Sequence, residues 1–198
     1  MNREVAIVDT GGANLASLCF ALERLGARGI PTRDAAVIRS ATHVVLPGVG
    51  SAAAGMHRLR AGALIDCIRS LTQPVLGICL GLQLLAEASE EDEVECLGIL
   101  PGRVHRLAAR PGAPVPNMGW CRVTWREPHA VLDGIDRDAW FYFVHSYALP
   151  PGAGTLGTAE HVASFTAVAG SGNFVATQFH PERSSAAGAR LLANFLSL

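Results

Sequence analysis

A ten-residue stretch, residues 74–83, limits strongly how this chain can fold. An apolar run over residues 74–78 stops at Cys79, and a run compatible with a helix follows over residues 82–88. Glycines stand two positions before and two after the cysteine, where a sharp strand-to-helix turn has no room for a Cβ. The pattern predicts a nucleophile elbow that presents Cys79 at the N-terminus of a helix, where free N–H groups favour a thiolate. A core cysteine packed behind a strand is the alternative interpretation.

The first half of the chain favours alternating strands and helices. Apolar runs predict buried strands at residues 4–9, 28–31, 43–46 and 75–78. Helices are expected at residues 14–25, 52–70 and 82–88, and Gly62 is expected to interrupt the second. Strand–helix–strand units of this kind predict a parallel sheet covered by helices. Active sites in such sheets lie at the carboxyl ends of the strands, which is where Cys79 falls.

The second half changes character and favours short strands separated by proline and glycine. These β-type runs lie at residues 101–107, 120–125, 139–147, 154–160, 164–168 and 174–178. An amphipathic helix is expected at residues 185–198. We therefore expect one domain over residues 1–198, of the α/β class. Its central sheet is mostly parallel with helices on both faces, and an antiparallel or mixed β extension follows.

Composition excludes several classes of function. The formal net charge is -1 and only 17% of residues are charged, so nucleic acid is not expected as the main partner. The five cysteines show neither CxxC pairs nor metal-ligand spacing, which indicates neither a disulfide framework nor a zinc site. No metal and no cofactor are expected. The apolar run near the N-terminus is too short for a signal or a membrane span. A cytoplasmic protein without a membrane partner is expected.

Two further motifs are candidates for chemistry beside Cys79. Residues 47–51, Pro-Gly-Val-Gly-Ser, follow a predicted strand; they form either an ordinary turn or a loop that presents backbone N–H donors. His180-Pro181-Glu182 follows the last predicted strand, and the proline restricts the backbone between the histidine and the carboxylate. A surface histidine beside a glutamate is the ordinary interpretation. Together with the elbow, however, the order favours a Cys–His–Glu relay.

These motifs resemble the class I glutamine amidotransferases, whose triad is cysteine, histidine and glutamate. The resemblance covers essentially the whole chain and is carried by Gly77-Ile78-Cys79-Leu80-Gly81-x-Gln83 and His180-Pro181-Glu182. Within that class, the chain is similar to the glutaminase subunits of imidazole glycerol phosphate synthase. The similar segments are residues 46–50, 118–120, 143–147 and 180–185.

The resemblance implies a role for each matching residue. Cys79 would attack the side-chain amide of glutamine, with His180 as base and then acid, and with Glu182 orienting the histidine. The oxyanion donors would be the Leu80 N–H and an amide of Gly48 or Val49. The positions implied to hold glutamine are Gly50, Gln83, Ser146 and Tyr147.

The resemblance also implies a partner, a (βα)8-barrel cyclase subunit that receives ammonia through a tunnel. The cyclase joins ammonia to a ribotide and releases imidazole glycerol phosphate and aminoimidazole carboxamide ribotide. The positions implied to face the partner are Asn14, Trp120, Tyr142 and Arg183. Their ordinary interpretations are a helix cap for Asn14, core aromatics for Trp120 and Tyr142, and a solvated side chain for Arg183.

Three departures from the family pattern accompany these matches. The first loop reads Asp9-Thr10-Gly11-Gly12-Ala13-Asn14 where the family usually has Asp-Tyr-Gly-x-Gly-Asn, and Arg183 stands where lysine is usual. An aromatic residue usually follows the Gly-Val-Gly-Ala run, whereas residues 51–53 here are Ser-Ala-Ala. Three alternatives stay open at this point. They are a glutaminase subunit of another amidotransferase, an amidase or peptidase of a related elbow-cysteine fold, and a non-catalytic regulatory subunit.

Overall fold

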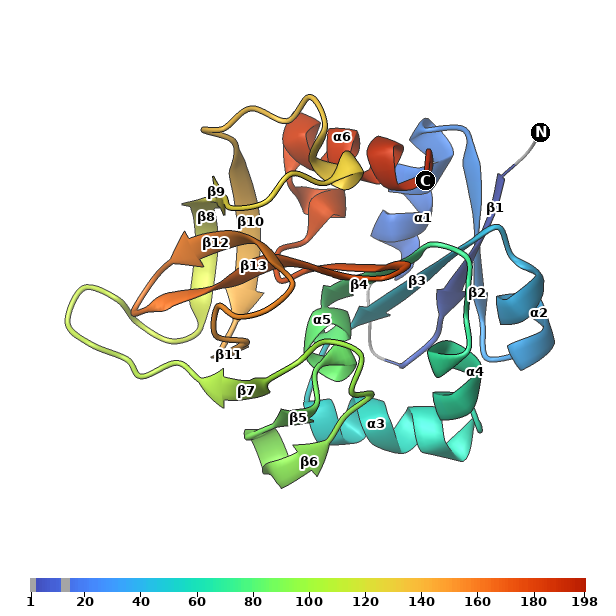
Figure 1. The fold of residues 1–198 in the computed structure, drawn as a ribbon, viewed down its shortest axis with the longest axis horizontal. Coiled ribbons are helices and arrows are strands. Elements are labelled where there is room, and N and C mark those ends of the chain that lie inside the picture. The colour runs from blue at the N-terminus through green and yellow to red at the C-terminus, as the bar shows by residue number, and fades with distance from the viewer. Residues whose placement is uncertain (1–2, 12–14) are drawn as a thin grey trace.

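The structure is a computed structural model that describes residues 3–11 and 15–198. Its centre is an eight-stranded sheet with the order β2-β1-β3-β4-β14-β13-β12-β9 (Figure 1). The strands from β2 to β14 run parallel, and β13, β12 and β9 continue the sheet antiparallel. These strands are β1 (Arg3–Val8), β2 (Ala27–Thr32), β3 (His43–Gly48), β4 (Val75–Cys79), β9 (Thr124–Trp125), β12 (Thr155–Glu160), β13 (Ser164–Ser171) and β14 (Phe174–Thr177).

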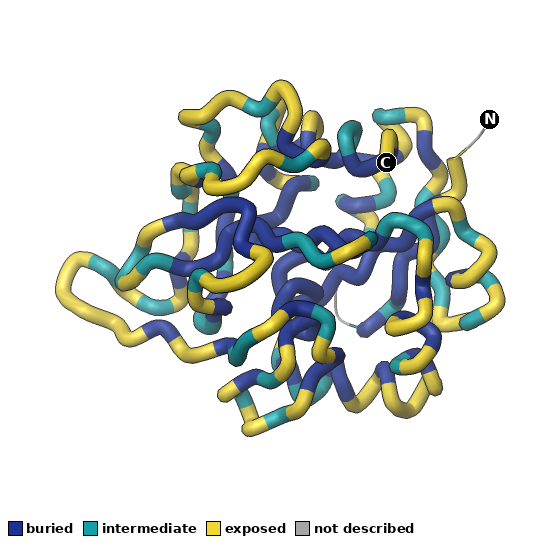
Figure 2. Tube along the Cα trace, in the orientation of Figure 1, coloured by how far each residue is buried: buried dark blue, intermediate teal, exposed yellow. Residues whose placement is uncertain are grey.

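Helices cover both faces of this sheet, as expected. On one face, α1 (Leu15–Arg24) and α6 (Ser185–Phe195) bury one set of apolar side chains. The opposite face packs against α2 (Ala35–Ser40), α3 (Ala52–Ala61), α4 (Ile65–Arg69) and α5 (Leu80–Leu85). Each strand alternates its side chains between these two apolar layers. Buried residues consequently follow the central strands in Figure 2.

Six further strands form two small sheets beside the main one (Figure 1). A two-stranded antiparallel sheet joins β8 (Asn117–Arg122) to β10 (Trp140–His145). The second sheet has the order β11-β7-β5-β6, built from β5 (Ala88–Ser89), β6 (Val94–Glu95), β7 (Arg103–Arg106) and β11 (Tyr147–Ala148). The expected antiparallel or mixed extension is thus divided among three sheets.

The helix after the elbow is shorter than predicted. It was expected to reach Ala88, but α5 ends at Leu85 because Ala86 is extended and Ala88 pairs within a sheet. The carbonyl of Leu85 accepts hydrogen bonds from the N–H groups of Ile99 and Leu100, at 2.9 and 2.8 Å. The closing helix also stops early, at Phe195. Short α2 was not predicted, whereas the interruption at residue 62 between α3 and α4 is confirmed.

Three short 3-10 helices complete the described chain: η1 (Glu91–Glu93), η2 (Ala130–Leu132) and η3 (Pro181–Arg183). Over residues 3–11 and 15–198, no helix has both the length and the apolar character required to cross a membrane. Nor do the described residues contain a group of three or more His, Cys, Asp or Glu side chains arranged to hold a metal ion.

Candidate active site

Cys79 lies on a sharp turn between β4 and α5, as the elbow pattern predicts. Its backbone has φ +54° and ψ -106°, a conformation that is strained for a residue with a side chain. A Cβ on Gly81 would lie 1.8 Å from the backbone carbonyl oxygen of Leu46, and one on Gly77 would lie 2.8 Å from Leu85 Cδ1. The two glycines therefore permit a close approach that the turn requires. Strand pairing places Gly48 of β3 opposite Cys79.

Two polar groups contact the sulfur of Cys79. The backbone carbonyl oxygen of Val144 lies 3.7 Å from Sγ and accepts a hydrogen bond from the thiol. The side-chain Nε2 of Gln178 also lies 3.7 Å from Sγ and donates to it. Cys79 itself is 8% exposed. The sulfur is therefore held between an acceptor and a donor, close to the surface.

His180 follows β14 and its ring is held by Glu182. The Nδ1 atom of His180 lies 2.9 Å from Oε1 of Glu182, and both side chains are largely buried. Because the carboxylate only accepts, Nδ1 carries the proton and Nε2 is the basic nitrogen. Among the described residues, Nε2 has no hydrogen-bond partner of normal geometry. That nitrogen is therefore available for the proton of the Cys79 thiol.

The surroundings of His180 strengthen it as a base. Burial disfavours the protonated ring, but Cys79 and Glu182 outweigh burial and raise the pKa of His180 to about 10. The backbone fixes the ring's position, since the His180 N–H donates to the Tyr142 carbonyl at 3.0 Å and the Ser184 hydroxyl donates to the His180 carbonyl at 2.7 Å. A proton taken from sulfur would thus form a stable imidazolium beside Glu182.

A cavity of about 280 Å³ opens directly over the elbow. This volume suits a ligand at the small end of the range that protein pockets accept. Eight residues predicted as site residues line it: Val49, Gly50, Cys79, Leu80, Gln83, Ser146, Tyr147 and His180. Gly48 and Glu182 do not line the cavity. Gly48 lies behind it, since a Cβ there would be 2.9 Å from Leu80 Cβ, and Glu182 contacts the remote nitrogen of His180.

The segment that ends β3 and continues beyond it, residues 47–51, borders the cavity and is named here the glycine loop. Gly50 has φ +90°, which only glycine adopts readily, and the Val49 side chain is exposed. Leu80 begins α5, and N–H groups in the first turn of a helix have no acceptor within that helix. Residues of the glycine loop and of the first turn of α5 thus line the same cavity as Cys79.

Three polar residues of the site were not predicted. Glu91 lines the cavity, and its Oε2 accepts a hydrogen bond from the Ala52 N–H at 2.7 Å; burial raises the pKa of Glu91. His145 also lines the cavity and is buried. Gln178 lies beneath Cys79 and donates to its sulfur. Only His145 carried a signal, through its position next to Ser146, because the other two depend on contacts between distant segments.

Two of the residues predicted to face a partner, Trp120 and Tyr142, lie on the same face of the two-stranded sheet. Tyr142 pairs with Trp120 across β10 and β8, and their rings meet edge-on at 6.1 Å. The Arg183 guanidinium lies 4.6 Å from the centre of the Tyr142 ring. Trp120 is 48% exposed, so its interpretation as a core aromatic is wrong. Asn14 lies outside the described residues.

Trp120 and Tyr142 belong to a wider apolar surface, named here the ribbon face, which comprises Met118, Trp120, Trp140 and Tyr142. The outward-facing positions of β8 and β10 supply these side chains. Met118 is 64% and Trp140 50% exposed. An exposed cluster of large apolar side chains marks a surface for another molecule.

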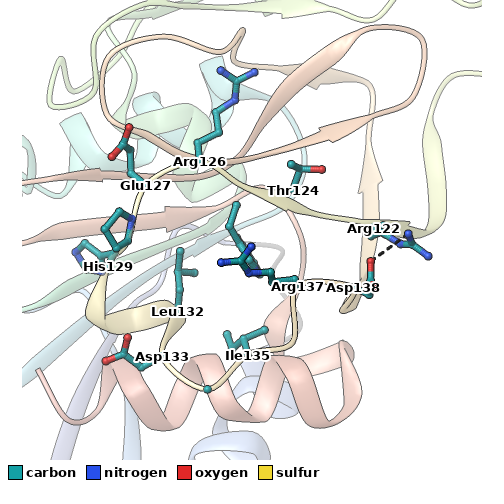
Figure 3. Close-up of a pocket in the computed structure, with 13 residues that line it drawn as sticks. Arg122, Thr124, Arg126, Glu127, His129, Leu132, Asp133, Ile135, Arg137 and Asp138 are labelled. Atoms are coloured by element: carbon teal, nitrogen blue, oxygen red, sulfur yellow. Dashed lines mark ion pairs between the residues drawn. The ribbon is translucent and has the colours of Figure 1, made fainter.

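A larger cavity, of about 640 Å³, shares no lining residue with the cavity over Cys79. Figure 3 shows the side chains that line it. Its lining comes from residues 122–138 and contains three arginines and three carboxylates. Arg122 and Asp138 form an ion pair with an N···O distance of 3.1 Å. These balanced charges favour no single class of ionic ligand, and no cysteine lines this cavity. The smaller cavity over the elbow is therefore the candidate active site.

Comparison with known proteins agrees with this geometry. Residues 6–198 match the family model described as glutamine amidotransferase class-I. The imidazole glycerol phosphate synthase subunit HisH 2 of Legionella pneumophila (strain Paris) is 49% identical over 194 residues, covering 98% of each chain. Subunit HisH of the same synthase from Xanthomonas axonopodis pv. citri (strain 306) is 49% identical over 195 residues, again covering 98% of each.

A solved structure shows the same fold. A Thermoplasma acidophilum protein described as a GMP synthase subunit superposes with a TM-score of 0.77 at 20% identity, covering 100% of this chain and 94% of that one. The family resemblance read from the elbow and the His-Pro-Glu motif is thereby confirmed. The chain belongs to the class I glutamine amidotransferases.

Proposed function

We propose that the protein is the glutaminase subunit of an imidazole glycerol phosphate synthase and acts in histidine biosynthesis. It hydrolyses glutamine and supplies ammonia to a cyclase subunit. One observation carries the proposal: a strained cysteine and a carboxylate-bound histidine with a raised pKa line a single cavity of about 280 Å³. Relatives that are 49% identical over nearly the whole chain bear the name of this subunit.

In the proposed reaction, Nε2 of His180 takes the proton from Cys79, and the sulfur attacks the side-chain amide carbon of glutamine. His180 then returns the proton to the amide nitrogen and the C–N bond breaks. Ammonia is released, and the γ-glutamyl group remains on Cys79 as a thioester. Water, deprotonated by His180, cleaves the thioester to glutamate and the free thiol. Glu182 keeps the imidazolium oriented throughout.

Negative charge on the substrate oxygen needs hydrogen-bond donors. The Leu80 N–H at the start of α5 is one proposed donor, and an amide of Gly48 or Val49 in the glycine loop is the second. Loss of one such donor typically costs about 2.7–4 kcal/mol of transition-state stabilisation. A loop that turns one amide toward the oxyanion only when the partner is bound would therefore control the rate.

The cavity's polar groups complement free glutamine. The α-ammonium group of glutamine requires an anion, and Glu91 is the carboxylate that lines the cavity. Oε2 of Glu91 already holds the Ala52 N–H, so we assign Oε1 to the ammonium group. We assign the remaining contacts to Gly50, Gln83, Ser146 and Tyr147, which all line the same cavity.

For the partner, we propose that the ribbon face, with Asn14 and Arg183, contacts a (βα)8-barrel cyclase. Ammonia passes to that cyclase through a tunnel and reacts there with phosphoribulosyl-formimino aminoimidazole carboxamide ribotide. The products are imidazole glycerol phosphate and aminoimidazole carboxamide ribotide. Exposed Trp120 and the Arg183–Tyr142 stack support this assignment, because aromatic and arginine side chains are enriched at interfaces. Under this proposal residues 1–198 act as one glutaminase domain.

The test is glutamate release from glutamine by the purified chain mixed with its cyclase, with and without the ribotide. Cys79→Ala is expected to abolish release. Cys67→Ala, which removes another buried cysteine from α4, is the matched control and is expected to retain it. Unchanged glutamate release by Cys79→Ala would rule out the mechanism. Turnover of a peptide without the cyclase would instead favour an amidase or peptidase.

A further inference from the structure

Gln178 approaches the reactive sulfur from inside the protein. It follows β14 directly, its N–H donates to the Ala167 carbonyl at 2.9 Å, and its side chain is 0% exposed. Nε2 of Gln178 lies 3.7 Å from Cys79 Sγ, within the range for a hydrogen bond to sulfur. Gln178 does not line the cavity over the elbow. It therefore contacts the nucleophile without contacting the space that glutamine would occupy.

A second glutamine fixes which end of the Gln178 amide faces the sulfur. Nε2 of Gln83 donates to Oε1 of Gln178 at 3.2 Å and to the Tyr147 carbonyl at 2.9 Å. Both hydrogens of the Gln83 amide are thus used, and the Gln178 oxygen is committed to Gln83. The Gln178 nitrogen must then point at Cys79. A flipped Gln178 amide would instead turn its NH₂ group against the NH₂ group of Gln83.

The sulfur's two contacts respond oppositely to its ionisation. The Val144 carbonyl accepts from a thiol but repels a thiolate, which has no proton to donate. The Gln178 N–H is a weak donor to a thiol, but with a thiolate it forms a charge-assisted hydrogen bond, which is shorter and stronger. Gln178 consequently favours the ionised sulfur over the neutral one. This is the form that attacks an amide carbon.

We propose that Gln178 is a catalytic residue that stabilises the Cys79 thiolate through its amide N–H, and that Gln83 is the positioning residue that orients this amide. The inference deepens the proposed function and rests on Cys79 as its nucleophile. It also gives Gln83 a second role beside its place in the cavity wall. Buried polar chains of this kind hold one geometry when every member is satisfied.

The other titratable groups around the cavity do not replace this donor. His180 is the proton acceptor, and Glu91 is an anion that disfavours a thiolate. Burial lowers the pKa of His145 to about 4, and its two nitrogens bond to Asn117 and the Tyr147 carbonyl. The Tyr147 side chain lines the cavity as well. Once His180 holds the proton it is a charged donor to the thiolate, and Gln178 adds a second, neutral donor from inside the protein.

The test measures the rate at which iodoacetamide alkylates Cys79 between pH 4 and pH 9, with the modified peptide quantified by mass spectrometry. Gln178→Met removes the donor at nearly constant volume. Because a thiolate gains more from this hydrogen bond than a thiol does, the acidic limb of the rate profile is expected to move up by about one to two pH units.

Gln73→Met is the matched control, because Gln73 donates only to backbone carbonyls near α2, far from the elbow. It is expected to leave the profile unchanged. In the complex with the cyclase, Gln178→Met is expected to lower kcat for glutamine about tenfold or more while KM stays near the wild-type value. A merely structural role would not shift the pH profile.

An acidic limb at the wild-type pH in Gln178→Met would overturn the proposal. If that variant does not fold, Gln178→Leu also removes the amide donor without adding an ionisable group; an unchanged limb there has the same meaning. Alkylation needs neither glutamine nor the cyclase. The two proposals can therefore fail separately. If Gln178→Met shifts the acidic limb but the wild-type protein with its cyclase releases no glutamate, the proposed function is refuted and the Gln178–Cys79 contact stands.

Discussion

Acid is expected to destabilise this fold through His145. Nδ1 of His145 lies 2.9 Å from the Tyr147 carbonyl and must carry a proton, so Nε2 is an acceptor, 3.0 Å from the Asn117 amide nitrogen. A second proton on Nε2 would oppose that amide. The ring also packs edge-on against Phe165 with centroids 4.8 Å apart. Burial therefore lowers the pKa of His145 to about 4, and the native state holds the ring neutral.

The size and sign of this acid destabilisation follow from the difference between the pKa of His145 in the folded protein and its pKa in the unfolded chain. The ordinary histidine pKa of 6.5 applies to the unfolded chain, and the folded pKa is about 4. As pH falls, the unfolded chain binds the proton first, so the free energy of unfolding declines between these two values. About 2.5 units at about 1.4 kcal/mol each give a total of about 3.5 kcal/mol. Roughly 2 kcal/mol of this is lost between pH 7 and pH 5.

Urea unfolding at pH 7 and pH 5, followed by circular dichroism, measures this loss. His145→Gln and His145→Asn remove the titration and keep an amide that can both donate and accept. Other titrating groups are shared, so the difference between wild type and variant isolates His145. The wild type is expected to lose about 2 kcal/mol more than either variant over this interval. Parallel pH dependence in all three proteins would refute the reasoning.

Three further substitutions test other contacts. Gly81→Ala places a Cβ 1.8 Å from a backbone oxygen and is expected to lower the free energy of unfolding by about 3 kcal/mol or more in urea titrations. Gly152→Ala is the control and is expected to be nearly neutral, because the space around its new Cβ is open. Trp120→Ala is expected to weaken binding to the cyclase at least about tenfold in calorimetry with the melting temperature unchanged, since the side chain is half exposed. Thr10→Val removes a buried 2.9 Å hydrogen bond to the Pro47 carbonyl and is expected to lower the free energy of unfolding by about 1–3 kcal/mol in urea titrations. Thr10→Ser keeps the hydroxyl and is expected to lower it less.

That Thr10 contact gives a structural meaning to one departure from the family pattern. Thr10 stands where tyrosine is usual, and its hydroxyl donates to the Pro47 carbonyl at the base of the glycine loop. Arg58 of α3 donates to the Thr10 carbonyl at 2.9 Å. The loop after β1 is thereby tied to the loop after β3 through a residue that departs from the family pattern. Arg183, the second departure, stacks on Tyr142 through its planar guanidinium, a contact suited to arginine.

The elbow could be predicted because its determinants are local. An apolar run, a cysteine and two flanking glycines define the turn within a few residues, and the strained φ of Cys79 follows from them. The parallel order of the first strands was predictable for the same reason, because the alternation of strand-type and helix-type sequence patterns defines strand–helix–strand units. The end of α5 was not, because it is set by backbone N–H groups of residues 97–100. Helix propensity contains no information about those distant donors.

The missed site residues share that physical origin. Glu91 belongs to an acidic run that looks like a solvated patch in the sequence, yet its carboxylate reaches the Ala52 N–H from 39 residues away. Gln178 contacts Cys79 across 99 residues. For Trp120, the family resemblance implied a partner-facing position, whereas the residues alone favoured the ordinary interpretation of a core aromatic. It is exposed because β8 and β10 form a separate two-stranded sheet with one face unpacked.

Strand order explains why such distant residues meet at one point. The sheet places β3, β4 and β14 side by side, and their carboxyl ends supply the glycine loop, the nucleophile, and the pair Gln178 and His180. Register pairs Gly48 with Cys79 and Thr177 with Ile78, so the backbone on both sides of the sulfur is held by strand hydrogen bonds. Sulfur and base are consequently preformed. Because β3 ends at Gly48, residues 49–51 of the glycine loop lack that restraint, and control of the reaction is expected to act there.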